Sequence, residues 1–145
     1  MLTGSYFNTV DSKGRAFVPT KLRYGLEERV WLAIGLDACI YVMAQDKWND
    51  FLAEYITPLS LKDGAGRKLQ RQILGNSREV EIDGHGRINI PPDYLAYAGI
   101  EKDIVFVGVG DRIELWDKKA YDVEMDPKTL NLSALILEVA NHNEL

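Results

Sequence analysis

The chain has 145 residues, the length of one ordinary domain, and its 46% hydrophobic and 27% charged residues place it among folded globular proteins rather than disordered ones. A net charge of −5 excludes a surface that is positively charged throughout, as in proteins that bind DNA over their whole surface. The acid excess lies in the C-terminal part, so a local basic patch elsewhere remains compatible with this total. The single cysteine excludes an internal disulfide, and no apolar run approaches the roughly 20 residues that span a bilayer. The first residues also lack the basic and apolar regions of a signal peptide. We therefore expect a cytoplasmic protein with no membrane partner.

The most informative feature along the chain is a repeat. Residues 5–19 recur as residues 77–91, with Ser, Asp, Gly, Arg and Pro at the same places in both copies. In each copy, apolar and polar residues alternate on both sides of an Asp-x-x-Gly-Arg turn, which is typical of a β-hairpin. Pro19 and Pro91 then open a short helix. Two further strands follow in each copy, at 30–34 and 39–42 in the first and at 104–107 and 113–116 in the second, with residues 108–110 as a turn.

The residues between the two copies predict two helices. Apolar side chains from Trp48 onward fall on one face of an amphipathic helix, which Pro58 should end. A polar linker with Gly64 and Gly66 then leads to a basic helical stretch over residues 67–74. These helices would separate the copies along the chain.

The C-terminal part predicts one more helix. Apolar residues at helical spacing follow Asp126-Pro127, and we expect this helix to pack on the body of the protein or on a neighbouring subunit. One copy of about 40 residues is too small to hold a core alone, so the two strand sets should interleave about a pseudo-twofold axis into one β-barrel with flanking helices. The predicted fold is α+β, with repeat one at 5–47, a helical connection at 48–76, repeat two at 77–119 and a C-terminal helical tail at 120–145.

The two Asp-x-x-Gly-Arg motifs, each followed by a Val-Pro or Ile-Pro pair, resemble those of the MraZ family. The Trp-containing helix between the copies and the segments Gly35-Leu36-Asp37 and Gly108-Val109-Gly110-Asp111 also match, so the resemblance runs from Gly4 to about Tyr121. It implies two tandem SpoVT-AbrB-type, swapped-hairpin repeats. It further implies a bacterial transcription regulator that is associated with the nucleoid, acts on the promoter of the division and cell-wall gene cluster, and assembles as a ring-shaped homo-oligomer.

On this resemblance, the two turns carry the DNA-binding side chains. The candidates for DNA contact are Lys13, Arg15, Lys21, Arg23, His85 and Arg87, and the residues that shape the turns are Asp11, Gly14, Asp83 and Gly86. His85 stands where relatives usually have glutamine. The Leu22-Arg23 pair of the first short helix is replaced by Tyr94-Leu95 in the second. Copy one therefore offers more basic side chains and is the expected base-reading surface.

The chemistry of these turns fits DNA and also permits a purely structural role. The planar fork of arginine can pair with guanine in the major groove, which admits a two-stranded β-ribbon, while lysine serves phosphate as a point charge. Alternatively, each arginine pairs with the aspartate of its own turn and only holds the loop; the two roles can coexist. A second basic group either contacts phosphates or forms a solvated helix face, and consists of Arg67, Lys68, Arg71 and Arg78.

Other classes of function receive less support. An enzyme with paired aspartates is not expected, because neither turn reads Asp-Thr-Gly or Asp-Ser-Gly and the nearby arginine keeps each carboxylate ionised. His85, His142 and Cys39 show no metal-ligand spacing, and no Gly-rich phosphate loop joins a strand to a helix. We therefore expect no metal, no cofactor and no small-molecule substrate. Three residues in apolar patterns are expected in the core or a subunit interface, namely Trp31, Trp48 and Trp116.

The resemblance thus implies a DNA-binding transcription regulator, expected to be a repressor at the promoter of its own division and cell-wall operon. Its expected partners are double-stranded promoter DNA with direct repeats and further copies of itself in a ring, because linked weak sites raise avidity by roughly a hundredfold or more. The alternative is an AbrB-type, antitoxin-like module that binds a protein toxin. Such modules usually carry one repeat and a disordered tail, whereas this chain has two repeats and a helical end.

Overall fold

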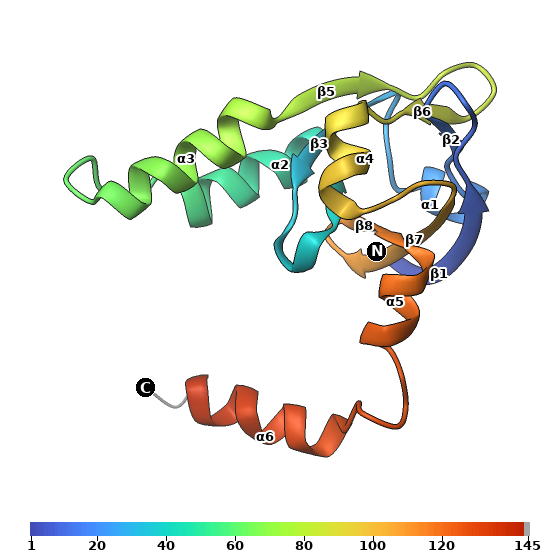
Figure 1. Cartoon of the computed structure of the whole chain (residues 1–145). Coiled ribbons are helices and arrows are strands. Elements are labelled where there is room, and N and C mark those ends of the chain that lie inside the picture. Colours follow the sequence, from blue (N-terminus) through green and yellow to red (C-terminus); the bar gives the residue numbers. More distant parts are fainter. Residues whose placement is uncertain (144–145) are drawn as a thin grey trace.

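The computed structural model describes residues 1–143, and it is a mixed α+β fold (Figure 1). The strands are β1 (Leu2–Thr9), β2 (Arg15–Phe17), β3 (Arg29–Ile34), β4 (Ile40–Met43), β5 (Arg78–Glu81), β6 (Arg87–Asn89), β7 (Asp103–Gly110) and β8 (Ile113–Asp117). The α-helices are α1 (Thr20–Arg23), α2 (Gln45–Phe51), α3 (Gly64–Asn76), α4 (Pro92–Ala98), α5 (Lys118–Glu124) and α6 (Leu132–Asn143). A 3₁₀ turn covers Leu36–Ala38, and a π turn over Leu52–Ile56 extends α2. Among these described helices, none combines the length and the apolar character needed to cross a membrane.

Six strands form one antiparallel sheet in the order β1-β7-β8-β4-β3-β5, and β2 pairs with β6 in a separate two-stranded sheet. The strands that correspond in the two copies are β1 and β5, β3 and β7, and β4 and β8. When each is exchanged for its counterpart, the order of the six-stranded sheet is the same, read from the other edge. The expected barrel is nevertheless not closed within the described residues, since β1 and β5 are the two edges of the larger sheet. The chain leaves both edge strands at the acid-arginine turns and enters the small β2-β6 sheet instead.

The strands on either side of each turn do not pair as a simple hairpin, which corrects the expectation from local alternation. Strand β1 pairs along its whole length with β7, from Leu2 opposite Gly110 to Thr9 opposite Asp103. Strand β5 pairs with β3, and β2 pairs with β6. The β1-β7, β3-β5 and β2-β6 pairs therefore each join one copy to the other.

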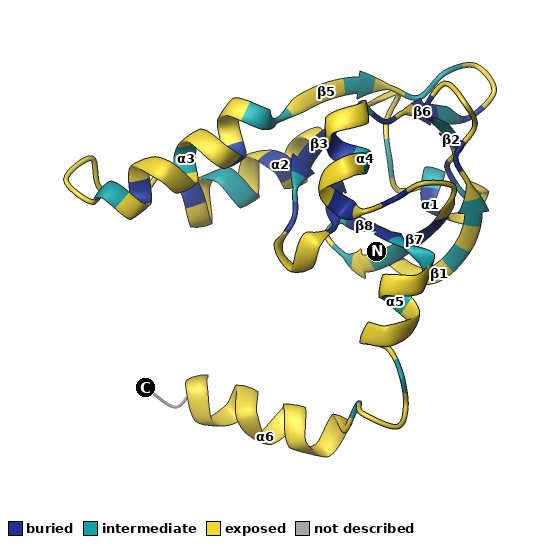
Figure 2. Ribbon diagram, viewed as in Figure 1, coloured by how far each residue is buried: buried dark blue, intermediate teal, exposed yellow. Residues whose placement is uncertain are grey.

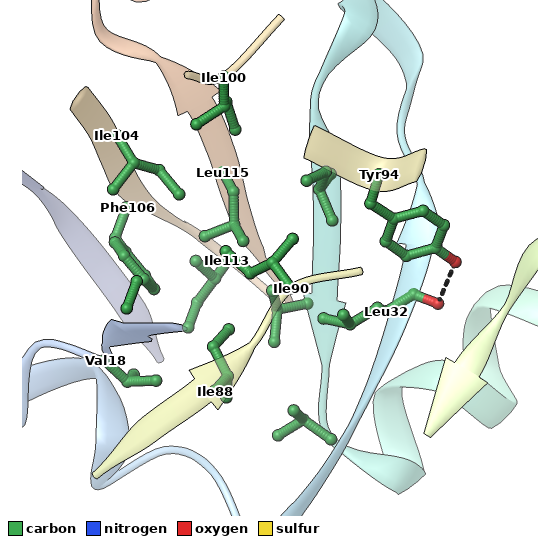
Figure 3. Close-up of a cluster of buried hydrophobic side chains, with 14 of the residues drawn as sticks. Val18, Leu32, Ile88, Ile90, Tyr94, Ile100, Ile104, Phe106, Ile113 and Leu115 are labelled. Carbon is green, nitrogen blue, oxygen red and sulfur yellow. Dashed lines mark hydrogen bonds between the residues drawn. The ribbon is translucent and has the colours of Figure 1, made fainter. Parts of the chain in front are cut away.

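The main core is built from both copies (Figure 3). Leu32 of β3 packs in the same buried cluster as Phe106 of β7 and Leu115 of β8, and all three side chains are fully buried. The Tyr94 hydroxyl crosses this core to within hydrogen-bond distance of the Leu32 carbonyl oxygen (3.0 Å), and it also contacts the Asn76 carbonyl oxygen. Burial raises the pKa of Tyr94 to about 12. Since neither copy holds this core alone, the two copies form one packed unit.

A second apolar cluster holds the helices between the copies on the sheet. The rings of Trp31 and Trp48 stack at 5.5 Å between centroids, and Trp48 and Trp116 are buried. The expected tryptophan core is thus present. The predicted glycine linker was wrong, because Gly64 and Gly66 lie inside α3, whose first turn is capped by the Asp63 carboxylate through the Ala65 N–H.

Two further expectations need correction near the second copy and the C-terminus. Residues 108–110 lie at the end of β7, and the turn to β8 falls on residues 111–112. Helix α6 begins at Leu132 rather than behind Asp126-Pro127, because the Asn131 side chain accepts the Ala134 N–H. Helix α5 was not expected from the pattern.

Helix α6 does not pack on the body of the chain, contrary to one of the two expectations for it. Every residue of α6 is exposed, and Figure 2 shows it separate from the buried core. Its large apolar side chains are between 43% and 68% exposed, namely Leu132, Leu135, Ile136, Leu137 and Val139. The last two residues of the predicted C-terminal tail, 144–145, lie outside the described residues.

Candidate nucleic-acid interface

The first acid-arginine turn is closed by the carboxylate of Asp11. One carboxylate oxygen accepts the backbone N–H groups of Lys13 and Arg15, both at 2.9 Å, and the other accepts the Arg15 Nε–H at 2.8 Å. The backbone adds two bonds, from the Asp11 N–H to the Arg15 carbonyl oxygen (2.8 Å) and from the Gly14 N–H to the Asp11 carbonyl oxygen (3.0 Å). One short side chain thus holds the whole turn.

The second turn repeats this arrangement almost atom for atom. The Asp83 carboxylate accepts the backbone N–H groups of His85 and Arg87, both at 2.9 Å, and also the Arg87 Nε–H at 2.9 Å. Gly86 and Gly14 have φ values of +81° and +82°, a region that glycine enters without steric cost. The two sequence copies therefore produce two turns of the same shape.

Each arginine is held in its turn by Nε and keeps its outer edge available. Among the described residues, Nη1 and Nη2 of Arg15 and Arg87 have no hydrogen-bond partner. The side chains of Arg15 and Arg87 are 32% and 23% exposed. The Asp-Arg pairing considered as an alternative is thus present, and it leaves free the two terminal nitrogens that a bidentate contact with guanine requires.

The two turns are joined through the small sheet. The Val18 N–H donates to the Gly86 carbonyl oxygen (2.9 Å), and the Ile90 N–H donates to the Gly14 carbonyl oxygen (2.7 Å). Figure 1 shows both loops beside β2 and β6, at the end of the molecule opposite α3. Both arginine turns therefore belong to one surface formed by the two copies.

The remaining candidates lie around this surface in different ways. Lys13 and His85 are exposed within their turns, and Lys21 is exposed on α1. Arg23 lies on α1 but packs against Gly86 of the second turn, and its Nη2 donates to Thr20 Oγ1 at 3.0 Å. The structure therefore brings all six predicted DNA-contact residues to the region of the turns or the adjoining helix α1.

The second basic group is not part of this surface. Arg78 forms a bidentate ion pair with Asp93 (3.0 and 2.8 Å), and Arg67 donates to the Leu61 carbonyl oxygen. Lys68 and Arg71 are exposed on α3, at the far end of the molecule from both turns (Figure 1). These residues therefore fit a solvent-exposed role better than contact with the DNA that would lie against the two turns.

Phe17 is a residue of this surface that the sequence reasoning missed. Phe17 is 53% exposed, and the Arg87 guanidinium lies over its ring with Cζ at 5.9 Å from the ring centroid. The available signal in the sequence was its position between the apolar residues Ala16 and Val18, because alternation along a strand puts Phe17 on the opposite face from both. Its counterpart in the second copy is Asn89, so Arg15 lacks such a ring.

The electrostatics of the turns favour ionised aspartates. The pKa of Asp83 is lowered to about 2, first by the hydrogen bond from the Arg87 backbone N–H and then by the Arg87 side chain and the His85 N–H. The pKa of Asp11 is lowered for the same reasons, with the Arg15 backbone N–H as the largest favourable contribution. An acid that shares or donates a proton near neutral pH needs a raised pKa, so this geometry is unlike that of paired catalytic aspartates.

We expect the Asp83 carboxyl to titrate at about 2, well below its ordinary value of 3.8. Because the pKa is lower in the folded chain, the ionised carboxylate stabilises the fold above pH of about 4, and this contribution is lost as the pH falls through about 2. An NMR titration of the side-chain carboxyl carbons measures the midpoint. In Arg87→Ala the backbone bonds remain, so the midpoint should rise only part of the way to 3.8. A wild-type midpoint at 3.8 would contradict the turn geometry.

Comparison with known proteins shows the family to which the chain belongs. The family model described as "MraZ protein, putative antitoxin-like" matches the chain twice, over residues 1–72 and 73–134. The transcriptional regulator MraZ of Thermoanaerobacter sp. (strain X514) is 38% identical over 143 residues, which cover 98% of this chain and 96% of that protein. The transcriptional regulator MraZ of Caldanaerobacter subterraneus subsp. tengcongensis is 42% identical over 123 residues, covering 84% and 85%. That of Acetivibrio thermocellus is 34% identical over 140 residues, covering 97% of each. With both halves matched by the family model and relatives similar over most of their length, the chain belongs to the MraZ family.

Proposed function

We propose that this chain is a sequence-specific, DNA-binding regulator of transcription without catalytic activity. The observation that carries the proposal is the pair of matching turns in which Asp holds Arg by Nε and leaves both terminal guanidinium nitrogens free. Such an edge is suited to the O6 and N7 acceptors of guanine. The names of the relatives, transcriptional regulator MraZ, support the same function.

In this function each turn residue has a definite task. Asp11 and Asp83 set the shape of the turns, and Gly14 and Gly86 supply the positive φ that this shape requires. Arg15 and Arg87 present their terminal nitrogens to base edges. The exposed side chains of Lys13, Lys21 and His85 and the half-buried Arg23 contact the DNA backbone or neighbouring bases.

The proposed assembly of several chains compensates for the weak DNA binding expected of one chain. Two turns offer few contacts, so we propose that several chains form a ring and bind direct repeats in the promoter, where avidity strengthens binding. In each chain, repeats at 5–47 and 77–119 would carry the turns, with 48–76 as the helical connection and 120–145 as the tail. The proposed site of action is the chain's own division and cell-wall operon, as a nucleoid-associated repressor in the cytoplasm.

The test is binding of the purified protein to a duplex from upstream of its own gene and to a scrambled duplex, across a salt series. The wild type should prefer its own duplex. Arg15→Ala and Arg87→Ala should each reduce that preference, because one bidentate arginine contact gives about 1–3 kcal/mol of discrimination, or about 5- to 150-fold in Kd. Arg71→Ala on α3 is the matched control, since it removes the same charge far from the turns, and it should keep the preference.

Two results would contradict this proposal. If the wild type binds both duplexes equally or binds neither, the chain is not a sequence-specific regulator of that promoter. If both turn variants keep the wild-type preference while remaining folded, the arginines only hold the loops. Circular dichroism and size-exclusion chromatography of each variant establish that folding and assembly are unchanged.

A second candidate function is an antitoxin-like module that binds a protein partner. The description of the matching family model favours it, and the exposed apolar side chains of α6 offer a surface for such a contact. Co-purification from the native cells of a small protein that is toxic when expressed alone, together with wild-type levels of DNA binding in Arg15→Ala, would favour this function over the first.

A further inference from the structure

We propose that helix α6 of one chain docks in an apolar groove of a second copy of this chain; this rests on the assembly of several chains in the proposed function. The groove has a volume of about 370 Å³. Its lining residues come from β3 and β4 of the sheet, from α2 and the π turn that extends it, and from α3. Apart from Asp111 and Arg112 in the turn between β7 and β8, they are apolar or aromatic.

The rim of this groove is exposed in the single chain. Leu36, Tyr55 and Leu69 line the groove and are 68%, 57% and 41% exposed. Ile56 and Ile73 lie deeper and are buried. Large apolar side chains that gather at an exposed surface mark a place where another protein surface binds. The groove therefore offers a buried apolar base and an apolar rim to an incoming element.

Helix α6 has the residue spacing that such a groove accepts. One stripe along the helix contains the apolar residues at i, i+3, i+4 and i+7, namely Leu132, Leu135, Ile136 and Val139. These are the anchor positions by which an amphipathic helix lies in an apolar groove. Every residue of α6 is exposed in the single chain, so the body of the chain does not cover the stripe (Figure 2).

A second copy of the chain is the occupant that the structure favours. Each chain carries one stripe and one groove, and α6 projects away from the body (Figure 1). The stripe and the groove are different surfaces, so their contact is heterologous: it leaves a free stripe at one end of a row of chains and a free groove at the other. A contact of this kind repeats from chain to chain until a ring closes. It thus supplies the geometry that the proposed ring requires.

The charges of the two surfaces also have opposite signs. Helix α3, which forms one side of the groove, contains Arg67, Lys68 and Arg71 and no acidic residue. Helix α6 contains Glu138 and neither lysine nor arginine. Opposite charges favour α3 against α6 and disfavour α3 against α3 of another chain. This contact also gives the basic side chains of α3 a role that does not involve the DNA at the two turns.

Docking at the groove would leave the DNA surface open. The two arginine turns lie at the end of the molecule opposite α3 (Figure 1). Chains joined through α6 and the groove would therefore keep both turns accessible in every subunit.

The test measures the mass in solution of full-length variants, by size-exclusion chromatography with light scattering at one fixed protein concentration. Leu135→Glu places a charge in the stripe, and Leu69→Glu places one at the rim of the groove. We expect each to weaken association by about 30-fold or more, as for a central interface residue, and to give smaller species than the wild type. The matched controls are Leu137→Glu and Leu74→Glu, on the same two helices but outside the stripe and the groove lining. Both controls should keep the wild-type mass.

A mixture of the two interface variants gives a sharper result. Leu69→Glu keeps a native α6, and Leu135→Glu keeps a native groove, so one native contact can form between them. The only other contact between the two chains would join two substituted surfaces. The mixture should therefore contain a dimer and no larger species.

Three outcomes would overturn the inference. These are a wild-type mass in folded Leu135→Glu or Leu69→Glu, an equal loss of mass in either control, and a mixture without the dimer. If Leu135→Glu keeps the wild-type mass, α6 is free for a different protein partner. Circular dichroism checks the folding of each variant, and Tyr55→Glu at the same rim replaces Leu69→Glu if that variant fails to fold.

A monomeric wild type would overturn this inference together with the proposed ring. The preference for the upstream duplex is measured separately, so a monomer that keeps this preference leaves the proposed DNA-binding function standing. An assembled wild type without that preference would count against the proposed function and not against the α6 contact.

Discussion

Replacing Phe106 with alanine is expected to lower the free energy of unfolding by about 3–5 kcal/mol, the range for large-to-small changes at fully buried aromatic residues. Phe106 is 0% exposed and lies in β7, between β1 and β8. The cavity would open where strands of the two copies meet (Figure 3), so the surrounding side chains cannot easily collapse into it. Urea unfolding followed by circular dichroism at one fixed protein concentration measures the change.

The matched control for this prediction is Phe7→Ala. Phe7 lies on the neighbouring strand β1 and is 57% exposed, so its truncation should change the free energy of unfolding by no more than about 0.5 kcal/mol. A loss below about 1 kcal/mol for Phe106→Ala would mean that the two copies do not share one close-packed core. A loss in Phe7→Ala as large as that in Phe106→Ala would contradict the assigned faces of β1.

The second large effect is expected for Gly86→Ala, which should destabilise the fold by about 1–3 kcal/mol through backbone strain alone. Gly86 has a φ of +81°, and the new Cβ would also collide with the Arg23 guanidinium at 1.9 Å. The substitution therefore strains the turn and displaces Arg23 from it. Urea unfolding measures the loss of stability, and the salt series on DNA measures the consequence for binding.

Gly84→Ala is a control within the same turn. Gly84 has no positive φ of this kind, and nothing lies within 4 Å of a Cβ built on it, so alanine should be tolerated. The double variant Gly86→Ala with Arg23→Leu separates the two effects, because it removes the guanidinium but keeps the backbone strain. Equal stability of Gly86→Ala and Gly84→Ala would show that the second turn does not have the geometry described.

Local chemistry explains why the turns could be predicted. The hydrogen bonds of the Asp11 carboxylate go to Lys13 and Arg15, so the residues that make the turn are also those that define its motif. The same holds for the helix face that begins at Trp48, where apolar spacing follows the helical period. Such features depend on a few neighbouring residues and can be read from the sequence.

Two predictions from local pattern failed because the surrounding structure decides the outcome: the glycine linker and the packing of α6 on the body of the chain. Gly64 and Gly66 suggest a linker by composition. The Asp63 side chain caps α3 ahead of both glycines, and Gly66 is buried within the helix. Helix α6 has apolar residues at helical spacing, which predicted its existence correctly. The same spacing could not predict that its apolar side chains stay exposed in the single chain.

The order of residues was enough to predict the two acid-arginine turns, the mixed α+β class and the MraZ family. Three contacts became visible only in the folded chain: β2 pairs with β6, Phe17 lies beneath Arg87, and Arg23 covers Gly86. These contacts join residues more than 60 positions apart. These contacts depend on how the strands of one copy pair with those of the other. The alternation of residues within either copy does not indicate that pairing. The shape of each turn is therefore local, whereas its complete set of charges comes from both halves of the chain.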